Sequence, residues 1–101
     1  MRIIVNYENI IVDNLDGIGM IRFNRPEILN SMITEMREEV LSGLTELEQD
    51  QSIRCIVITG EGKAFSAGGN LKELQELTLL EGRRRLQRGH LLLKKILEIE
   101  K

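Results

Sequence analysis

An amphipathic helix followed directly by a β-branched run constrains the fold of this chain more than any other feature. The helix is predicted by apolar residues that recur every three or four positions and so share one face: Ile33, Met36, Val40, Leu44 and Leu47. Ser31 is placed to cap its start, and it should end near 49–51. Residues 53–59, Ile-Arg-Cys-Ile-Val-Ile-Thr, then predict a strand buried on both faces. With a strand before the helix, this order predicts a βαβ unit with a parallel crossover.

The segment before the helix supplies that strand and predicts an antiparallel hairpin. Residues 3–12 are rich in β-branched side chains and are interpreted as one strand, and 18–23 alternates as a second. Asp16-Gly17 between them is a strong hairpin-turn signal. Pro26 cannot donate a hydrogen bond to a sheet, so 24–30 is predicted as a loop. The fold class is α/β, or α+β with a mixed sheet.

Two helices are predicted after the loop that follows the strand over residues 53–59. Residues 71–77 have the pattern of a short helix. Thr78 can cap a longer one, because Thr78-Leu79-Leu80-Glu81 is a capping-box pattern. Leucines recur along this helix at positions 86, 93 and 97, and charged residues fill many of the other positions. The 101 residues are enough for one domain.

Composition and charge exclude several classes of protein. A net charge of −2 argues against a general nucleic-acid binder, whose domains are strongly basic. The sequence has no run of about 18 apolar residues, so no membrane-spanning helix is predicted. The single cysteine cannot form an intramolecular disulfide, and the N-terminus turns polar too soon for a signal peptide. We therefore expect a cytoplasmic protein.

The loop after the buried strand holds the residues best suited to chemistry. Residues 66–69, Ser-Ala-Gly-Gly, are small and stand between a strand end and a helix start. Backbone N–H groups at a helix start lack partners and attract an anion or a developing oxyanion. Small residues let a substrate approach that backbone closely. On these residues alone, an ordinary connecting loop is the stronger interpretation, because such loops commonly follow strands.

Two longer segments resemble one known family. Residues 60–74, Gly-Glu-Gly-Lys-Ala-Phe-Ser-Ala-Gly-Gly-Asn-Leu-Lys-Glu-Leu, are similar to the first oxyanion-hole segment of the enoyl-CoA hydratase/isomerase (crotonase) family. Residues 24–31, Asn-Arg-Pro-Glu-Ile-Leu-Asn-Ser, are similar to its earlier CoA-contacting loop, at the family's usual spacing. The resemblance implies a crotonase-like (ClpP/crotonase) fold. Residues 1–101 would be a partial domain, a ββαβ-type N-terminal half with a mixed sheet and flanking helices.

The same resemblance implies a site for an acyl-CoA thioester, with coenzyme A as part of the substrate and with no separate cofactor or metal. It assigns to Gly69 the backbone N–H that binds the thioester oxygen and stabilises an enolate-like intermediate. Lys63 matches a position that faces the CoA phosphates. The remaining matched positions line the CoA and acyl pocket: Ala67, Asn70, Leu71 and Lys72 on one side, and Glu27, Ile28 and Leu29 on the other.

The rest of the family pattern limits the activity expected of this chain. Hydration of an enoyl thioester also needs a second N–H donor and a carboxylate pair. In the family these come after the position that matches Lys101. We therefore predict an acyl-CoA-binding member of a family of fatty acid metabolism, inactive as these 101 residues alone. It should form a homo-oligomer or pair with a chain that covers its exposed core. The alternative is a non-catalytic half-domain that acts in CoA binding or in assembly.

Three other features have competing interpretations. His90 lies on a predicted helix without an evident partner, which favours a surface or packing role over catalysis. Cys55, in the predicted buried strand, is expected to be a small core hydrophobe rather than a nucleophile. The cluster Arg83-Arg84-Arg85 with Arg88 can attract CoA phosphates, but a solvated helix face is the commoner arrangement.

Overall fold

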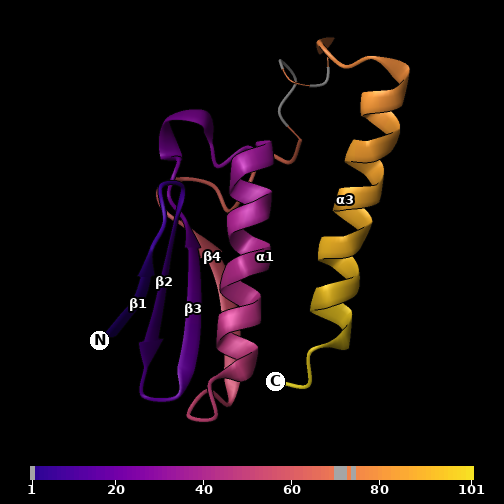
Figure 1. The fold of residues 1–101 in the computed structure, drawn as a ribbon. Helices are drawn as coiled ribbons and strands as arrows, with labels where there is room; N and C mark the ends of the chain where they lie inside the picture. The colour runs from indigo at the N-terminus through magenta and orange to yellow at the C-terminus, as the bar shows by residue number, and fades with distance from the viewer. Residues whose placement is uncertain (1, 70–72, 74) are drawn as a thin grey trace.

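The computed structural model describes residues 2–69, 73 and 75–101, which form one mixed sheet with helices (Figure 1). The elements follow in this order: β1 (Arg2–Asn6), β2 (Ile10–Leu15), β3 (Ile18–Phe23), the short 3-10 helix η1 (Pro26–Ile28), α1 (Thr34–Gln49), β4 (Cys55–Gly60) and α3 (Leu79–Glu98). The strand order is β1-β2-β3-β4, with the first two pairs antiparallel and β3-β4 parallel. This arrangement confirms the predicted α/β class.

The N-terminal segment forms three strands, so the predicted single strand over residues 3–12 is wrong. The chain reverses between β1 and β2, and Asn9 fixes the reversal. Its backbone N–H donates to the Glu39 carboxylate of α1 at 2.9 Å, and its side-chain amide donates to the same carboxylate. The predicted Asp16-Gly17 turn is confirmed, with both residues at positive φ, 51° and 88°, between β2 and β3.

Helix α1 packs its apolar face on the sheet and connects β3 to β4. The core combines four residues of the predicted helix face with side chains of β2 and β3: Met36, Val40, Leu44, Leu47, Ile10, Val12, Ile21 and Phe23. Full burial of one such large side chain contributes about 1.5–3 kcal/mol. The strands β3 and β4 are parallel neighbours, as the βαβ pattern predicted. The predicted end of the helix near residue 49 is also confirmed.

The start of α1 differs from the prediction. The helix begins at Thr34, and the Ser31 hydroxyl does not cap it but donates to the Ile28 carbonyl at 2.7 Å. The carboxylate of Glu73 accepts from the Thr34 N–H at 3.0 Å and from its hydroxyl at 3.2 Å. A negative group at a helix start offsets the positive end of the helix dipole. A residue 39 positions away therefore provides the contact that a local pattern had assigned to Ser31.

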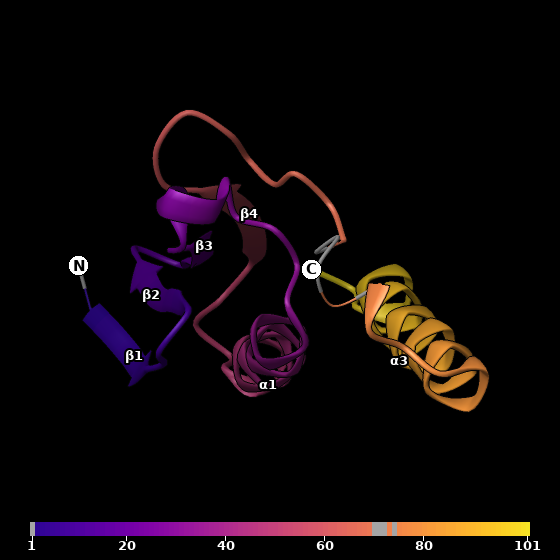
Figure 2. The same cartoon turned by 90° about the horizontal axis from the view of Figure 1, so that it is seen from above.

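Strand β4 is not buried on both faces, so that prediction is also wrong. It lies at the edge of the sheet, where β3 is its neighbour. Ile56 and Ile58 pack against the core, whereas Cys55 and Val57 are exposed. Both α1 and α3 lie on one side of the sheet (Figure 2), which leaves the other face of β4 without a covering helix among the described residues. Cys55 is therefore not a core hydrophobe.

Helix α3 lies beside α1, on the side of the molecule away from β1 (Figure 2). Its predicted capping box is confirmed: the Thr78 hydroxyl accepts from the Glu81 N–H at 3.2 Å, and the Glu81 carboxylate accepts from the Thr78 N–H at 3.0 Å. Leu92 is buried, whereas the three leucines at positions 86, 93 and 97 are exposed. Tertiary packing therefore holds α3 at few points.

The predicted short helix over residues 71–77 falls mostly on a part of the chain that the structure does not describe. Residues 73 and 75 are helical, and residues 71, 72 and 74 lie outside the described residues. None of the described helices combines the length and the apolar character needed to cross a membrane.

Candidate functional site

The loops that follow β3 and β4 lie side by side, because these strands are parallel and end at the same edge of the sheet. We call the contact between residues 24–32 and 61–69 the loop junction. The fully buried Asn30 donates from Nδ2 to the carbonyl oxygens of Glu61 and Ala64, each at 2.9 Å. Its Oδ1 accepts from the Arg25 N–H at 2.8 Å. One side-chain amide thus fixes both loops.

Further hydrogen bonds extend the loop junction toward the small residues. The Ser66 hydroxyl donates to the Asn30 carbonyl at 2.7 Å. The Ala67 N–H donates to the Leu29 carbonyl at 2.9 Å. Because these bonds tie successive residues of one loop to successive residues of the other, the small-residue segment is held along its length rather than at one point.

The peptide group between Gly68 and Gly69 has a fixed orientation. The Met32 N–H donates to the Gly68 carbonyl at 2.6 Å, and Gly68 has a φ of 87°, which favours glycine. In a trans peptide the C=O and the N–H point in opposite directions, so the Gly69 N–H points away from the Met32 amide. Among the described residues this N–H donates no hydrogen bond. A fixed backbone donor without an acceptor is what an oxyanion hole requires.

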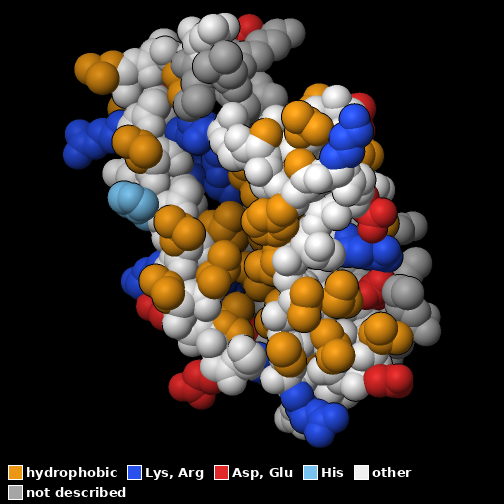
Figure 3. All heavy atoms as spheres, turned by 180° about the vertical axis from the view of Figure 1, so that it is seen from behind, with side chains coloured by type: hydrophobic (Ala, Val, Ile, Leu, Met, Phe, Trp, Pro, Cys, Tyr) orange, Lys and Arg blue, Asp and Glu red, His pale blue; other side chains and the backbone are white. Residues whose placement is uncertain are grey.

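Both glycines line a cavity of about 590 Å³ between the loop junction and α3. We call it the apolar cavity, because most of its other lining residues are hydrophobic: Phe23, Met32, Val40, Ile58 and Phe65 on the side of the sheet, α1 and the loops, and Leu86, Leu92, Leu93 and Ile96 on α3. Figure 3 shows hydrophobic side chains gathered along the seam between α3 and the sheet. A cavity of this size and character suits the apolar part of a small molecule.

Comparison with known proteins decides the family. The family model described as enoyl-CoA hydratase/isomerase matches residues 13–101. The chain belongs to the enoyl-CoA hydratase/isomerase family. The "Probable enoyl-CoA hydratase echA8" of Mycobacterium bovis is 42% identical to this family member over 77 residues, which are 76% of this chain and 30% of that protein. The 4-chlorobenzoyl coenzyme A dehalogenase-2 of an Arthrobacter species is 44% identical over 66 residues, which are 65% of this chain and 24% of that protein.

Solved structures agree with this assignment. The enoyl-CoA hydratase of Bacillus anthracis superimposes with a TM-score of 0.86 at 28% identity, over 91% of this chain and 36% of that one. An enoyl-CoA hydratase/isomerase of Xanthobacter autotrophicus Py2 superimposes with a TM-score of 0.76 at 30% identity, over 82% of this chain and 32% of that one. The fold is therefore crotonase-like, as predicted. This family member spans 30% of the length of the Mycobacterium bovis relative.

Among the residues that the family resemblance assigned and the structure describes, Gly69 is the one that lines the apolar cavity. Lys63 and Ala67 lie on the same loop, but both are exposed and outside the described cavity lining. Their proposed contacts with CoA stay predictions. Three further assigned residues lie outside the described part of the chain: Asn70, Leu71 and Lys72.

The predicted opposite wall of the CoA pocket lies on the surface of the loop that follows β3. Glu27 is exposed and forms an ion pair with Arg25, which lowers the pKa of the Glu27 carboxyl from its ordinary value. Ile28 is half-buried, and Leu29 is exposed with a φ of 53°. The loop junction places these residues beside the small-residue segment, but they do not belong to the described lining of the apolar cavity. Their role in CoA binding also stays a prediction.

Sequence reasoning missed the residues that build the loop junction. Asn30 belongs to the segment 24–31 that resembles the CoA-contacting loop, and Ser66 is one of the small residues, but no sequence pattern assigns a structural role to either. The bonds that they make across the loop junction join residues 31 to 36 positions apart along the chain. A buried polar side chain with distant backbone partners leaves no periodic or local signal, so one sequence alone could not reveal this contact.

A second opening, which we call the arginine cleft, adjoins the apolar cavity. Its volume is about 190 Å³, and four arginines of α1 and α3 line it: Arg37, Arg84, Arg85 and Arg88. Arg37 and Arg85 also line the apolar cavity. Burial, and next the like charge of Arg85, lower the pKa of the Arg37 guanidinium from its ordinary value. Sequence reasoning had missed Arg37 and had favoured a solvated face for Arg85, which is half-buried.

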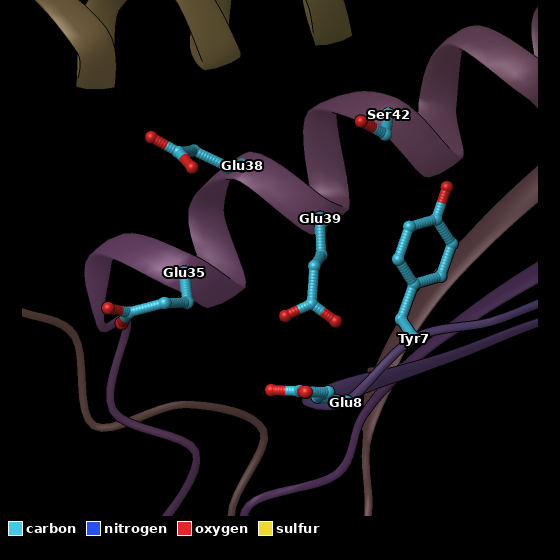
Figure 4. Close-up of a pocket in the computed structure, with 6 residues that line it drawn as sticks. All are labelled: Tyr7, Glu8, Glu35, Glu38, Glu39 and Ser42. Atoms are coloured by element: carbon cyan, nitrogen blue, oxygen red, sulfur yellow. The ribbon is translucent and has the colours of Figure 1, made fainter.

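A third opening, of about 390 Å³, lies between α1 and the β1–β2 turn and is rich in carboxylates. Figure 4 shows Glu39 and Tyr7 extending into the same space, whereas Glu38 points away from it. Glu39 holds Asn9, as described above, and the Tyr7 hydroxyl lies 3.5 Å from a Glu46 oxygen. Burial, and next Glu46, raise the pKa of Tyr7. These groups fasten the turn to the helix and do not form a candidate site.

Proposed function

We propose that residues 1–101 form the part of an enoyl-CoA hydratase/isomerase-family enzyme that binds the acyl-CoA thioester, with the Gly69 N–H as the first oxyanion donor. One observation carries this proposal: the Gly69 N–H has a fixed direction and no described acceptor, and its residue lines the apolar cavity. Family membership supports the same reading. Coenzyme A enters as part of the substrate.

The proposed chemistry follows from these surroundings. The thioester oxygen accepts the Gly69 hydrogen bond, and the acyl chain lies in the apolar cavity. Negative charge that develops on this oxygen strengthens the bond, because the donor is already oriented and needs no reorganisation. One such donor is worth about 3–4 kcal/mol of transition-state stabilisation. The Gly69 N–H thus provides part of the stabilisation that an enolate-like intermediate needs.

We further propose that the 101-residue chain binds the thioester without turning it over. Among the described residues that line the apolar cavity, the titratable ones are Arg37, Arg85 and His90, and none is a carboxylate. Hydration needs groups that deliver and accept protons at the reacting carbons. His90 is exposed, and no described residue orients it. A non-catalytic role in CoA binding or assembly is the alternative, and measurable hydration of crotonyl-CoA by the purified chain would contradict the expected lack of turnover.

The exposed leucines of α3 support an assembly with further protein. Leu86 is 66% exposed and Leu97 is 84% exposed, and both belong to an otherwise amphipathic helix. Exposed apolar groups that gather on one surface mark interfaces. We therefore propose a homo-oligomer or a partner chain on this side of the protein, in an enzyme of cytoplasmic fatty acid metabolism.

Calorimetric binding of butyryl-CoA and of free CoA to the purified chain tests the thioester proposal. Butyryl-CoA should bind more tightly than CoA, and Gly69→Pro, which lacks the N–H, should lower this preference about five- to tenfold, the value of one hydrogen bond. Gly69→Ala keeps the N–H and is the matched control. Equal affinity for CoA and butyryl-CoA would contradict the proposal, as would equal losses in both variants.

A further inference from the structure

The apolar cavity leads from Gly69 to a concentration of positive charge. Arg37 and Arg85 line both this cavity and the arginine cleft, so the two openings share a wall. Arg84 and Arg88 complete the cleft from α3. A ligand held by its thioester at Gly69 therefore has an apolar wall along its acyl chain and guanidinium groups where the cavity meets the cleft.

Within the described part of the chain, the arginines of the cleft have no ion-pair partner. Among the described residues, the guanidinium groups of Arg37, Arg84, Arg85 and Arg88 form no ion pair or hydrogen bond. On Arg85, Nε and Nη2 are buried and have no hydrogen-bond partner. An unpaired buried donor costs free energy that a suitable acceptor would recover.

The two acidic residues at the cleft already have other partners. Glu73 accepts from the N–H and hydroxyl of Thr34, and Glu81 accepts from the Thr78 N–H in the capping box. Glu73 also attracts the Arg37 charge, yet burial and Arg85 dominate and lower the pKa of that guanidinium. Arginine remains protonated at neutral pH even so. The cleft is thus a positively charged pocket, and Arg37 within it is only 5% exposed.

We propose that the preferred acyl group carries a carboxylate at its far end, which Arg85 and Arg37 bind while Gly69 holds the thioester oxygen. This inference rests on the proposed function, because it uses the same cavity, and it adds the substrate class. A guanidinium matches a carboxylate with two parallel hydrogen bonds, which gives both affinity and orientation. The carboxylate supplies the acceptors that the buried Arg85 nitrogens lack.

Matched pairs of thioesters test this inference by calorimetry on the 101-residue chain. Glutaryl-CoA is compared with pentanoyl-CoA, and adipyl-CoA with hexanoyl-CoA, so each pair differs in the terminal charge. The chain should bind the carboxylated member of at least one pair about tenfold more tightly, as expected for a charge-assisted contact. Arg85→Gln should remove most of this preference, because it should weaken binding of the carboxylated thioesters more than binding of the uncharged ones.

The control is Arg83→Gln, because Arg83 lies on the same helix but is exposed and outside the described cleft lining. This variant should keep the full preference. If Arg85→Gln loses its helical circular dichroism, the exposed cleft residue Arg88 provides a second variant, Arg88→Gln, with the same expected direction.

Three outcomes overturn the inference in distinguishable ways. Equal affinity within both pairs removes the carboxylate preference but leaves the proposed thioester site intact. In the second outcome, Arg85→Gln weakens charged and uncharged thioesters equally, with no such weakening when 3′-dephospho-CoA thioesters are used. That result would assign the arginines to the CoA phosphate. Failure of the chain to bind any acyl-CoA more tightly than CoA removes the proposed function and, with it, this inference.

Discussion

The loop junction and helix α3 form opposite walls of the same cavity, but they are held in different ways. Hydrogen bonds between residues far apart in the sequence fix the loop junction, and its central side chain, Asn30, is fully buried. Helix α3 itself has one buried side chain, Leu92, an ion pair between Lys95 and Glu48, and a local capping box. The segment that follows it adds the packing of Ile99 and the bonds from Lys101 to the Leu47 and Asp50 carbonyls. The wall that carries the Gly69 N–H is thus held by many specific contacts, whereas the wall formed by α3 is held by fewer.

This difference suits the proposed division of work. An oxyanion donor acts only when its direction is fixed before the charge develops. A wall that contacts an acyl chain needs to adapt to length and shape, and regions with few buried contacts open at a lower free-energy cost. The following substitutions test whether the two walls differ in the way described.

The largest loss should come from Asn30→Ala. The change removes the bonds to Glu61, Ala64 and Arg25, and so takes the Asn30 side chain away from three partly buried backbone groups. It also places alanine at a φ of 54°, a left-handed backbone conformation that glycine and asparagine adopt more readily than alanine. We expect a loss of about 4 kcal/mol in the free energy of unfolding, measured by urea denaturation.

Asn24→Ala is the control for this experiment, because Asn24 is an exposed asparagine of the same loop. It should change the free energy of unfolding by less than about 0.5 kcal/mol. A loss below about 1 kcal/mol for Asn30→Ala would mean that the loop junction does not hold the two loops.

A glycine pair compares the two walls directly. A Cβ on Gly60 would lie 2.5 Å from the Phe65 carbonyl oxygen and 2.7 Å from that of Ala64, so Gly60→Ala forces the loop junction apart. We expect a loss of about 3 kcal/mol. In α3, nothing lies within 4 Å of a Cβ on Gly82, so Gly82→Ala should stabilise the helix by up to about 1 kcal/mol. Thermal unfolding of both variants checks this. A shift of the unfolding temperature in the same direction for both would contradict the difference between the loop junction and α3.

Much of the sheet and α1 could be predicted, because their signals are local. Hydrophobic periodicity gave the helix face, and Asp16-Gly17 gave the β2–β3 turn. What failed depended on contacts between distant residues. Asn9 and Glu39 split the expected first strand, and the sheet order leaves β4 at an edge where Cys55 is exposed. An apolar run predicts a strand, but its sequence does not say which strands lie beside it.

In the candidate site, too, the sequence predicted what depends on local residues and missed what depends on distant contacts. The position of Gly69 followed from the family resemblance, whereas its cavity depends on α3, whose placement no local pattern specifies. The arginine cleft brings together Arg37 of α1 and Arg85 of α3, which are 48 positions apart in the sequence. A sequence shows that both residues are basic but not that they meet.

The attachment of α3 to α1 can be tested at Leu92, the buried leucine of this helix. Leu92→Ala should cost about 2 kcal/mol, near the low end for such a change, because the site lies at the margin of the core and is 9% exposed. Leu97→Ala is the control, since Leu97 is 84% exposed, and it should cost less than about 0.5 kcal/mol. Hydrogen exchange should accelerate along α3 in the first variant and stay unchanged in β2 and β3. Acceleration throughout the sheet would show that α3 and the sheet unfold as one unit.

The smallest effect should come from the capping box of α3. Thr78→Ala removes the acceptor for the Glu81 N–H and should cost about 1 kcal/mol, whereas Thr78→Ser keeps the hydroxyl and should cost little. Because few tertiary contacts hold α3, this local loss should appear as faster hydrogen exchange in its first turn while the loop junction stays protected. At α1 the corresponding contact comes from the distant Glu73, so Glu73→Gln should instead disturb the packing of two separate segments. Equal exchange in Thr78→Ala and Thr78→Ser would show that side-chain capping does not stabilise this wall of the cavity.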